Sequence, residues 1–202
     1  MESIEAEALA RSDRYLREFV EALELCPFAR RCREAGRLAR RVLRGGRPGE
    51  ATSAAVRELE LTSEEQVEVA LLIYPEFDGE LSRFEEFRDE VRKGLRLFYC
   101  VAFHPDLPID LSNENRAVSF LRRSPDPTLQ LVRVTTLDRV RSGRPAGSVY
   151  VDPSKLSEDV LQSQSIPTVS EQIARANLRT LQRHDAAGLA NLLAGLRRSP
   201  PA

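Results

Sequence analysis

The chain has 202 residues, of which 42% are hydrophobic and 30% are charged, and its formal net charge is −1 at pH 7. This composition is typical of one folded domain, and the near-zero net charge argues against binding to nucleic acid or an anionic membrane through an overall field. The first residues show no signal-peptide pattern, and the apolar runs are too short to span a bilayer. Three cysteines without framework spacing favour reduced thiols, so we expect a cytoplasmic protein.

The first part of the chain is predicted to be mostly helical. Its apolar periodicity predicts a helix over residues 3–25. Pro27 interrupts that pattern and can open a short helix that ends before Gly36. The following elements are a weak strand over 37–43, a Gly-rich loop over 45–49 and a helix over 51–61.

The clearest strands lie in the middle of the chain. Residues 67–74 are predicted to be a strand because they contain the continuous apolar run 69–74, which Pro75 ends, and residues 98–103 form a second run that ends at His104. A capping-box pattern at Ser82 predicts the start of a helix between them. Strand, helix and strand in this order make a βαβ unit, so we expect the two strands to be parallel.

The segment after this unit is predicted to be helical as well. A short helix is expected over residues 113–121. Asp126 followed by Pro127 is typical of a helix start, because Asp is a good N-cap and proline is tolerated at the first helical position. This pattern predicts another helix over 127–134.

The C-terminal part begins with an irregular segment. Residues 142–167 are rich in Gly, Pro, Ser and charge, and we interpret them as a loop insertion. A second capping box at Thr168 opens the last helix, which breaks near Gly188 and ends in a frayed tail over 197–202. Together the elements predict a single α/β domain with a small mixed or parallel sheet of three or more strands, a βαβ unit and a cover of helices.

Cys26, in the segment Cys26-Pro27-Phe28-Ala29, is the first candidate catalytic residue. If Pro27 is the first helical residue, the thiol lies at a helix N-cap, where unpaired N–H groups, the helix dipole and nearby arginines favour the thiolate. The alternative is a cysteine packed as a small hydrophobe at a helix corner, and local features alone favour it. Cys32 is six residues away, which does not match a C-x-x-C redox pair, and Cys100 is expected in the core.

His104 follows a predicted buried strand, at the end where ligands bind in open α/β sheets. A histidine there can act as acid or base, or it can cap the strand by hydrogen bonding to a nearby carbonyl, and the sequence leaves both roles open. His104 and Asp106 would need a third ligand to hold a metal, and nothing specifies one, so no metal site is predicted. His184 lies in a polar stretch and is predicted to be a solvated surface residue.

Arg123 and Ser124 precede the helix predicted at Pro127, and Arg133 lies one to two turns further along it. A guanidinium and a hydroxyl beside a helix N-terminus can bind carboxylate or phosphate. A rigid Pro-rich turn whose arginine pairs with an acid is the alternative. Asp126 as the N-cap would compete with a bound anion.

Eight arginines lie between Arg30 and Arg47, with Glu34 as the only acid. Such a segment could contact a phosphate backbone. Aromatic residues other than Phe28 are missing, so we interpret the segment as a solvated basic face.

Five segments, in this order, resemble the bacterial family called domain of unknown function 1415. They are Glu-Leu-Cys-Pro-Phe-Ala at 24–29, Leu-Leu-Ile-Tyr-Pro at 71–75, Phe-His-Pro-Asp at 103–106, Arg-Ser-Pro-Asp-Pro at 123–127 and Ile-Ala-Arg-Ala-Asn at 173–177. The family brings no established reaction. The resemblance implies only which residues belong together: Cys26, His104, Arg123, Ser124, Arg133 and Asn177.

The chain also departs from the family pattern at three positions. Gln130 stands where the family usually has His, Arg122 where it has Asn, and Val134 where it has Glu. If the missing histidine were catalytic in the family, this member would be altered or inactive.

On these grounds we expect a Cys/His-dependent hydrolase or transferase that acts on a small anionic substrate carrying carboxylate or phosphate. A non-catalytic anion-binding, metabolite-binding or regulatory protein is the second hypothesis, and a nucleic-acid accessory protein is the third. The sequence specifies no cofactor and leaves the oligomeric state open. In the enzyme hypothesis Cys26 is a nucleophile or positioning thiol, His104 is the acid or base, and the substrate contacts come from Asp106, Arg123, Ser124, Arg133 and Asn177.

Overall fold

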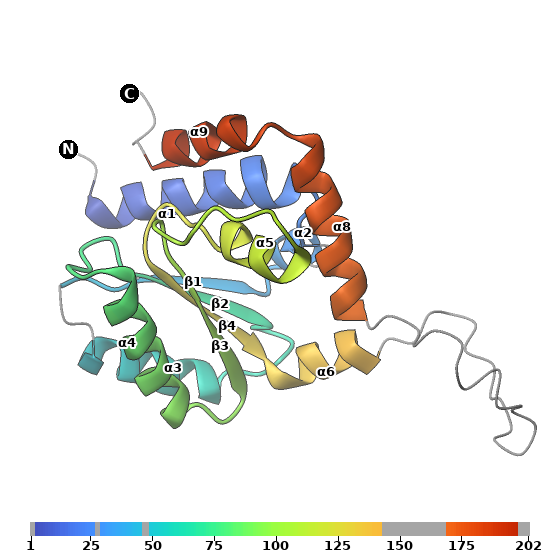
Figure 1. The fold of residues 1–202 in the computed structure, drawn as a ribbon. Helices are drawn as coiled ribbons and strands as arrows, with labels where there is room; N and C mark the ends of the chain where they lie inside the picture. The colour runs from blue at the N-terminus through green and yellow to red at the C-terminus, as the bar shows by residue number, and fades with distance from the viewer. Residues whose placement is uncertain (1–2, 27–28, 46–48, 143–168, 198–202) are drawn as a thin grey trace, which may run out of the picture.

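The structure, a computed structural model, describes residues 3–26, 29–45, 49–142 and 169–197. A four-stranded sheet lies between two layers of helices (Figure 1). Its strands are β1 (Leu38–Val42), β2 (Val69–Ile73), β3 (Phe98–Phe103) and β4 (Thr128–Arg133). The helices are α1 (Ile4–Arg14), the π-helical η1 (Tyr15–Glu21), α2 (Ala29–Glu34), α3 (Gly49–Leu61), α4 (Leu81–Gly94), α5 (Glu114–Leu121), α6 (Val134–Ser142), α8 (Val169–Arg183) and α9 (Ala186–Leu196).

The strand order is β1-β2-β4-β3, and the sheet is mixed. β1 and β2 are parallel, whereas β4 is antiparallel to both of its neighbours. β2 and β3 therefore run in the same direction, as the βαβ pattern predicts, but β4 lies between them and splits the unit. The predicted α/β fold with a small mixed sheet and a helical cover is confirmed.

The helix predicted over residues 127–134 is wrong, because this segment forms β4. Leu129 and Leu131 are fully buried on one face, while Gln130 and Val132 point to the other. That two-residue alternation belongs to a strand, and tertiary burial between β2 and β3 overrides the local Asp-Pro start signal. A helix does follow, but it begins only at Val134.

Smaller differences concern the ends of helices. α4 begins at Leu81 with Glu80 as its N-cap, so the capping box predicted at Ser82 is wrong. The break in the last helix lies at Asp185, whose side chain accepts from the N–H groups of Ala187 and Gly188. The predicted loop insertion beyond residue 142, Thr168 and the tail beyond residue 197 lie outside the described residues.

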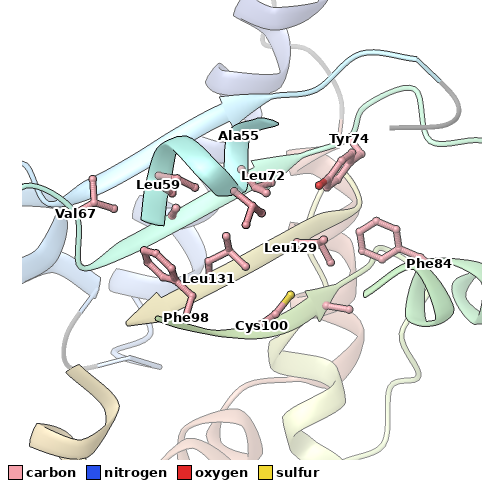
Figure 2. Packing of buried hydrophobic residues seen from close by; sticks show 13 residues of the cluster. Ala55, Leu59, Val67, Leu72, Tyr74, Phe84, Phe98, Cys100, Leu129 and Leu131 are labelled. Carbon is pink, nitrogen blue, oxygen red and sulfur yellow. The ribbon is translucent and has the colours of Figure 1, made fainter. Parts of the chain in front are cut away.

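One face of the sheet packs against α3 and α4 (Figure 2). Leu59 of α3 and Phe84 of α4 lie over the strands, and Tyr74 closes the end of β2. The Tyr74 hydroxyl is hydrogen-bonded to the Thr52 hydroxyl (3.1 Å), which satisfies two polar atoms inside this core. The largest of the three clusters of buried apolar residues therefore lies on this face.

The other face carries α1 and the C-terminal helices (Figure 1). Leu71 and Ile73 of β2 pack against Ala8 of α1, because alternate residues of a strand point to opposite faces. A separate cluster joins η1, α5, α8 and α9, with Phe19 and Phe120 at its centre. No helix within the described ranges is long and apolar enough to cross a membrane.

Candidate functional site

His104 directly follows β3 and organises the turn that leaves the sheet. The residue is 2% exposed. The N–H of Asp106 donates to His104 Nδ1 (3.1 Å), and the N–H of Leu107 donates to the His104 carbonyl (3.3 Å). Because Nδ1 accepts a hydrogen bond, the neutral ring carries its proton on Nε2. His104 Nδ1 thus fixes the backbone of this turn by accepting from an N–H group, whereas the capping role considered from the sequence was a hydrogen bond to a carbonyl.

Two arginines from distant parts of the chain reach the same turn. Arg123, just after α5, donates through Nη1 to the Leu107 carbonyl. Arg197, the C-cap of α9, donates through Nη2 to Asp106 Oδ1 (3.1 Å). Among the described carboxylates, none forms an ion pair with Arg123. We call His104, Asp106, Arg123 and Arg197 the His104 cluster.

Burial and repulsion between cations set the protonation of this cluster. Burial lowers the pKa of His104; the Asp106 carboxylate opposes this shift, and Arg197 adds to it. Burial also lowers the pKa of the Arg123 guanidinium, and repulsion from Arg197 lowers it further. The imidazole is therefore neutral at pH 7, and the positive charge of the cluster comes from its two arginines.

The segment that precedes β4 is a closed turn rather than a helix start. Ser124 Oγ donates to the Asp126 carbonyl (2.6 Å), and Thr128 Oγ1 donates to the same oxygen (2.9 Å). The Asp126 carboxylate accepts two hydrogen bonds from Arg11 of α1, each 2.9 Å long. An anion site at a helix N-terminus beside Ser124 therefore has no helix to form it. The segment is a turn, but its acid Asp126 pairs with Arg11 of α1, whereas the sequence alternative had the arginine of the turn itself pairing with an acid.

Arg133 ends β4 and is 6% exposed. Its Nε donates to the Val67 carbonyl (2.8 Å), and its Nη2 donates to the carbonyls of Leu59 and Thr62. The guanidinium also lies 4.6 Å from the centre of the Phe98 ring. These carbonyls lie at the C-terminal end of α3 and before β2, so Arg133 stabilises the negative end of that helix. Arg133 is paired with Phe98 at the start of β3, whereas Arg123 contacts the turn after its end, so the structure does not place the two guanidinium groups side by side.

Cys26 lies between η1 and α2 and is half-buried. Its carbonyl accepts from the Ala29 N–H (3.2 Å). Its thiol interacts electrostatically with the Tyr15 hydroxyl and with Cys32. Residues 27–28 lie outside the described part of the chain, so the helix N-cap position of Cys26 stays a prediction.

Cys26 and His104 lie at opposite ends of the strands. Cys32, which interacts electrostatically with Cys26, also interacts with Glu68 and the Val69 backbone at the start of β2. His104 follows the end of β3. β2 and β3 both pair with β4, and their ends lie at the same position along it. A strand rises ~3.3 Å per residue, so the five residues of β2 separate the two ends by ~13 Å. The structure therefore does not bring this thiol and this imidazole together.

The remaining family positions are spread over the fold. Asn177 is 7% exposed on α8, which packs against α5, where Arg175 pairs with Glu114 (3.6 Å). Gln130 lies in the middle of β4, paired with Leu71 of β2 and Val101 of β3. Within the described residues, no hydrogen bond joins Asn177 to the His104 cluster.

The arginine-rich segment that begins at Arg30 is neutralised by acids from other elements. Glu21 of η1 accepts two hydrogen bonds from Arg33 (2.7 and 2.9 Å), and Glu68 pairs with Arg37 (2.9 Å). Arg47 lies outside the described residues. The other arginines of the segment that the structure describes, Arg30, Arg31, Arg40, Arg41 and Arg44, each lie within 4.0 Å of a carboxylate.

Arg197 was not identified from the sequence, although it completes the His104 cluster. It lies in the segment predicted to fray, and its only sequence signal is a basic residue after a helix. Arg11 and its bond to Asp126 were missed for a similar reason, because the two residues lie far apart in the chain. Among the described side chains, no three His, Cys, Asp or Glu residues gather as metal ligands.

The comparisons with known proteins bear on the family alone. No curated protein and no solved structure matches the chain. A family model described as "Protein of unknown function (DUF1415)" matches residues 7–162, which is more than half of the chain. The matched range includes Cys26, His104 and Arg123, and it ends before Asn177 and Arg197. The chain therefore belongs to the DUF1415 family.

Proposed function

We propose that the protein binds a small anion with a carboxylate or phosphate group at the His104 cluster, as a binding protein rather than a Cys26-dependent enzyme. The observation that carries this proposal is the meeting of Arg123 and Arg197 at one turn with a single carboxylate, Asp106, bonded to Arg197. Glu85 of α4 is the next acid that influences the cluster.

The state of Arg123 favours an incoming anion. Its guanidinium is half-buried and donates to a neutral carbonyl. Burial and the charge of Arg197 both disfavour its charged form, as the lowered pKa indicates. A carboxylate or phosphate that bridged the two guanidinium groups would relieve both effects and could accept bidentate hydrogen bonds.

His104 would be a positioning residue for this site. It holds the backbone that presents the Leu107 carbonyl to Arg123 and the Asp106 carboxylate to Arg197. Cys26 has no part in the proposed binding, because it lies at the other end of the strands. Cys26→Ser is therefore expected to leave anion binding unchanged.

Thermal unfolding with added orthophosphate or malonate, at ionic strength matched with NaCl, tests the proposal. A ligand that binds only the folded state raises Tm with its concentration. We expect a rise for the parent protein and its loss in Arg123→Gln. Arg116→Gln is the matched control, because Arg116 lies on α5 and is exposed in its pair with Asp110.

A second variant protects the test against a folding defect. Arg197→Gln changes an exposed residue at the end of α9 and should also remove the rise in Tm. A full rise in both Arg123→Gln and Arg197→Gln, or the same rise with NaCl alone, would overturn the proposal.

A further inference from the structure

The two faces of β3 differ in how completely they are covered. Phe98, Cys100 and Ala102 point toward α3 and α4, and each of them is 5% exposed or less. The residues between them point to the opposite face, where Tyr99 is 41% exposed and Val101 is half-buried. The helices on that side of the sheet therefore leave this part of the face accessible.

β4 continues the accessible face with Gln130 and Val132, which are also half-buried. Gln130 is paired with Val101 and Val132 with Tyr99, so the four side chains are neighbours. We call Tyr99, Val101, Gln130 and Val132 the β3–β4 patch. Within the described residues the Gln130 side chain makes no hydrogen bond. Its amide is therefore available to a ligand that reaches the patch.

Arg122 brings a guanidinium to this patch from α5, which lies on the same side of the sheet (Figure 1). Its carbonyl accepts from the His104 N–H (3.0 Å) just after β3, and its side chain interacts with Tyr99 near the start of β3. The side chain therefore extends back along β3. It is half-buried, and it donates no hydrogen bond to any residue in the described ranges.

The acids nearest this part of the sheet have other partners. Asp89 of α4 pairs with Arg88 (3.0 Å) and with Arg92 (3.6 Å). Glu60 of α3 accepts from two backbone N–H groups just before β3 (2.7 and 3.1 Å). The other acids of α4 are Glu85, Glu86 and Glu90.

The charge of Arg122 is not balanced by any of these acids. Burial lowers the pKa of Arg122, Tyr99 opposes the shift, and repulsion from Arg88 adds to it. Among the described residues no carboxylate acts on this guanidinium. A half-buried cation without a counter-ion is unfavourable, and a carboxylate from outside the chain would offset that cost.

We propose that Arg122 and the β3–β4 patch bind a small carboxylate with a flat apolar body, at a site separate from the His104 cluster. The carboxylate would accept hydrogen bonds from the Arg122 guanidinium and the Gln130 amide. The apolar body would pack on Val101 and Val132, beside the Tyr99 ring. Charge complementarity selects an anion, and the valines favour a carboxylate with an apolar body over orthophosphate, which gains nothing from them.

The probe is 4-fluorobenzoate, and 4-fluorobenzamide is its neutral control of the same shape. Titration followed by fluorine NMR gives a Kd for each compound. The parent protein should bind the carboxylate about tenfold more tightly than the amide, as expected for one charge-assisted hydrogen-bonded contact. Failure of 4-fluorobenzoate to bind would overturn the proposal and leave the patch to another occupant.

Arg122→Met keeps an apolar stem beside the patch and removes the charge. It should weaken 4-fluorobenzoate about tenfold and leave 4-fluorobenzamide unchanged, so that the preference for the carboxylate disappears. Gln130→Leu is a second variant, which removes the amide at similar size and should weaken 4-fluorobenzoate about threefold. Arg116→Gln, at an exposed position of α5, is the control that should bind like the parent.

The same variants keep this site distinct from the His104 cluster. Arg122→Met should retain the malonate-induced rise in Tm, because Arg122 does not belong to that cluster. A malonate response without 4-fluorobenzoate binding would overturn this site alone, and the reverse result would overturn only the proposal for the cluster. Full affinity for 4-fluorobenzoate in Arg122→Met, or equal binding of the amide by the parent, would also overturn the site.

Discussion

The two ends of the strands differ in how their arginines are balanced. At the end that carries Cys26, the arginines meet buried carboxylates or helix carbonyls, as Arg33 meets Glu21 and Arg133 meets the end of α3. At the end that carries His104, Arg123 has no described carboxylate as an ion-pair partner. Basic residues at the first end are part of the fold. At the second end Arg11 and Arg197 pair with Asp126 and Asp106, and Arg123 is the guanidinium that we propose receives a ligand. The number of arginines in a segment does not reveal this difference.

The largest effect is expected for Arg133→Ala, which tests whether the Cys26 end is structural. The change leaves the carbonyls of Leu59, Thr62 and Val67 without their charged donor and opens space beside Phe98. We expect the free energy of unfolding to fall by about 3 kcal/mol. Urea unfolding measures it, with Arg57→Ala of α3 as the exposed control. A loss no larger than that of the control would contradict the comparison.

Arg33→Ala should have the next largest effect, because it leaves the buried Glu21 carboxylate with only the weaker contact to Arg30. We expect a loss of about 2 kcal/mol at pH 7. The Arg33 hydrogen bonds hold the pKa of Glu21 in the folded state below its usual value. The stabilisation is therefore fully present at pH values above the pKa of Glu21 in the unfolded chain, and it is lost as the pH falls through the pKa of Glu21 in the folded state.

Urea unfolding of the parent protein and Arg33→Ala at several pH values checks this dependence. The difference between the two proteins should shrink as pH falls below about 4.5, where unfolded glutamate begins to take up protons. A difference that stays constant down to acid unfolding would show that the pair does not act through the Glu21 charge.

His104 should give a smaller effect with a different pH window. Burial lowers its pKa in the folded state, so the unfolded chain takes up the proton first and stability falls as pH drops below about 6.5. His104→Asn supplies an oxygen acceptor for the Asp106 N–H but does not titrate. We expect a loss of about 1 kcal/mol at pH 7.5 and a flatter pH dependence than in the parent.

Chemical unfolding between about pH 5.5 and 7.5 measures this slope. His184→Asn is the control, because His184 is exposed and its replacement should leave the slope unchanged. Equal slopes in the parent and His104→Asn would contradict a buried neutral imidazole.

The smallest effect on stability, and a graded one on reactivity, is expected from the cysteines. Burial raises the pKa of Cys32 to about 11 and that of Cys100 to about 12. Cys26 is half-buried and should react first with iodoacetamide at neutral pH. Peptide mass mapping gives the order, and labelling of Cys100 before Cys26 would contradict the placement. Cys26→Ser should leave the phosphate-induced rise in Tm intact.

The sequence predicts most of this fold because most elements carry their own pattern. β2 and β3 are short apolar runs with clear ends, and α3, α4 and α5 show helical periodicity. The sequence does not predict β4 because Asp126-Pro127 matches the local pattern of a helix start. Residues 128–133 are extended because they pair with β2 and β3 on either side, which the local sequence does not reveal. The direction of β2 and β3 was predictable, but the strand between them was not.

The candidate site was predictable only in part. His104 and Arg123 carry strand-end and turn signals, so their region could be identified, although the role first suggested for Arg123 depended on a helix that is not there. Arg197 comes from the far end of the chain, and no periodicity links it to residue 106. Arg133 has the same residue type as Arg123, and its partners are carbonyls that a sequence cannot reveal.

The position of β4 has a consequence for synthesis of the chain. β3 pairs only with β4 among the described strands, and β4 is the last of them to leave the ribosome. Until residue 133 has emerged, β3 has no hydrogen-bonding partner in the sheet and β2 has one side unpaired. Unpaired strands are sites of intermolecular association, so a nascent or truncated chain that ends before β4 is expected to aggregate or to require a chaperone.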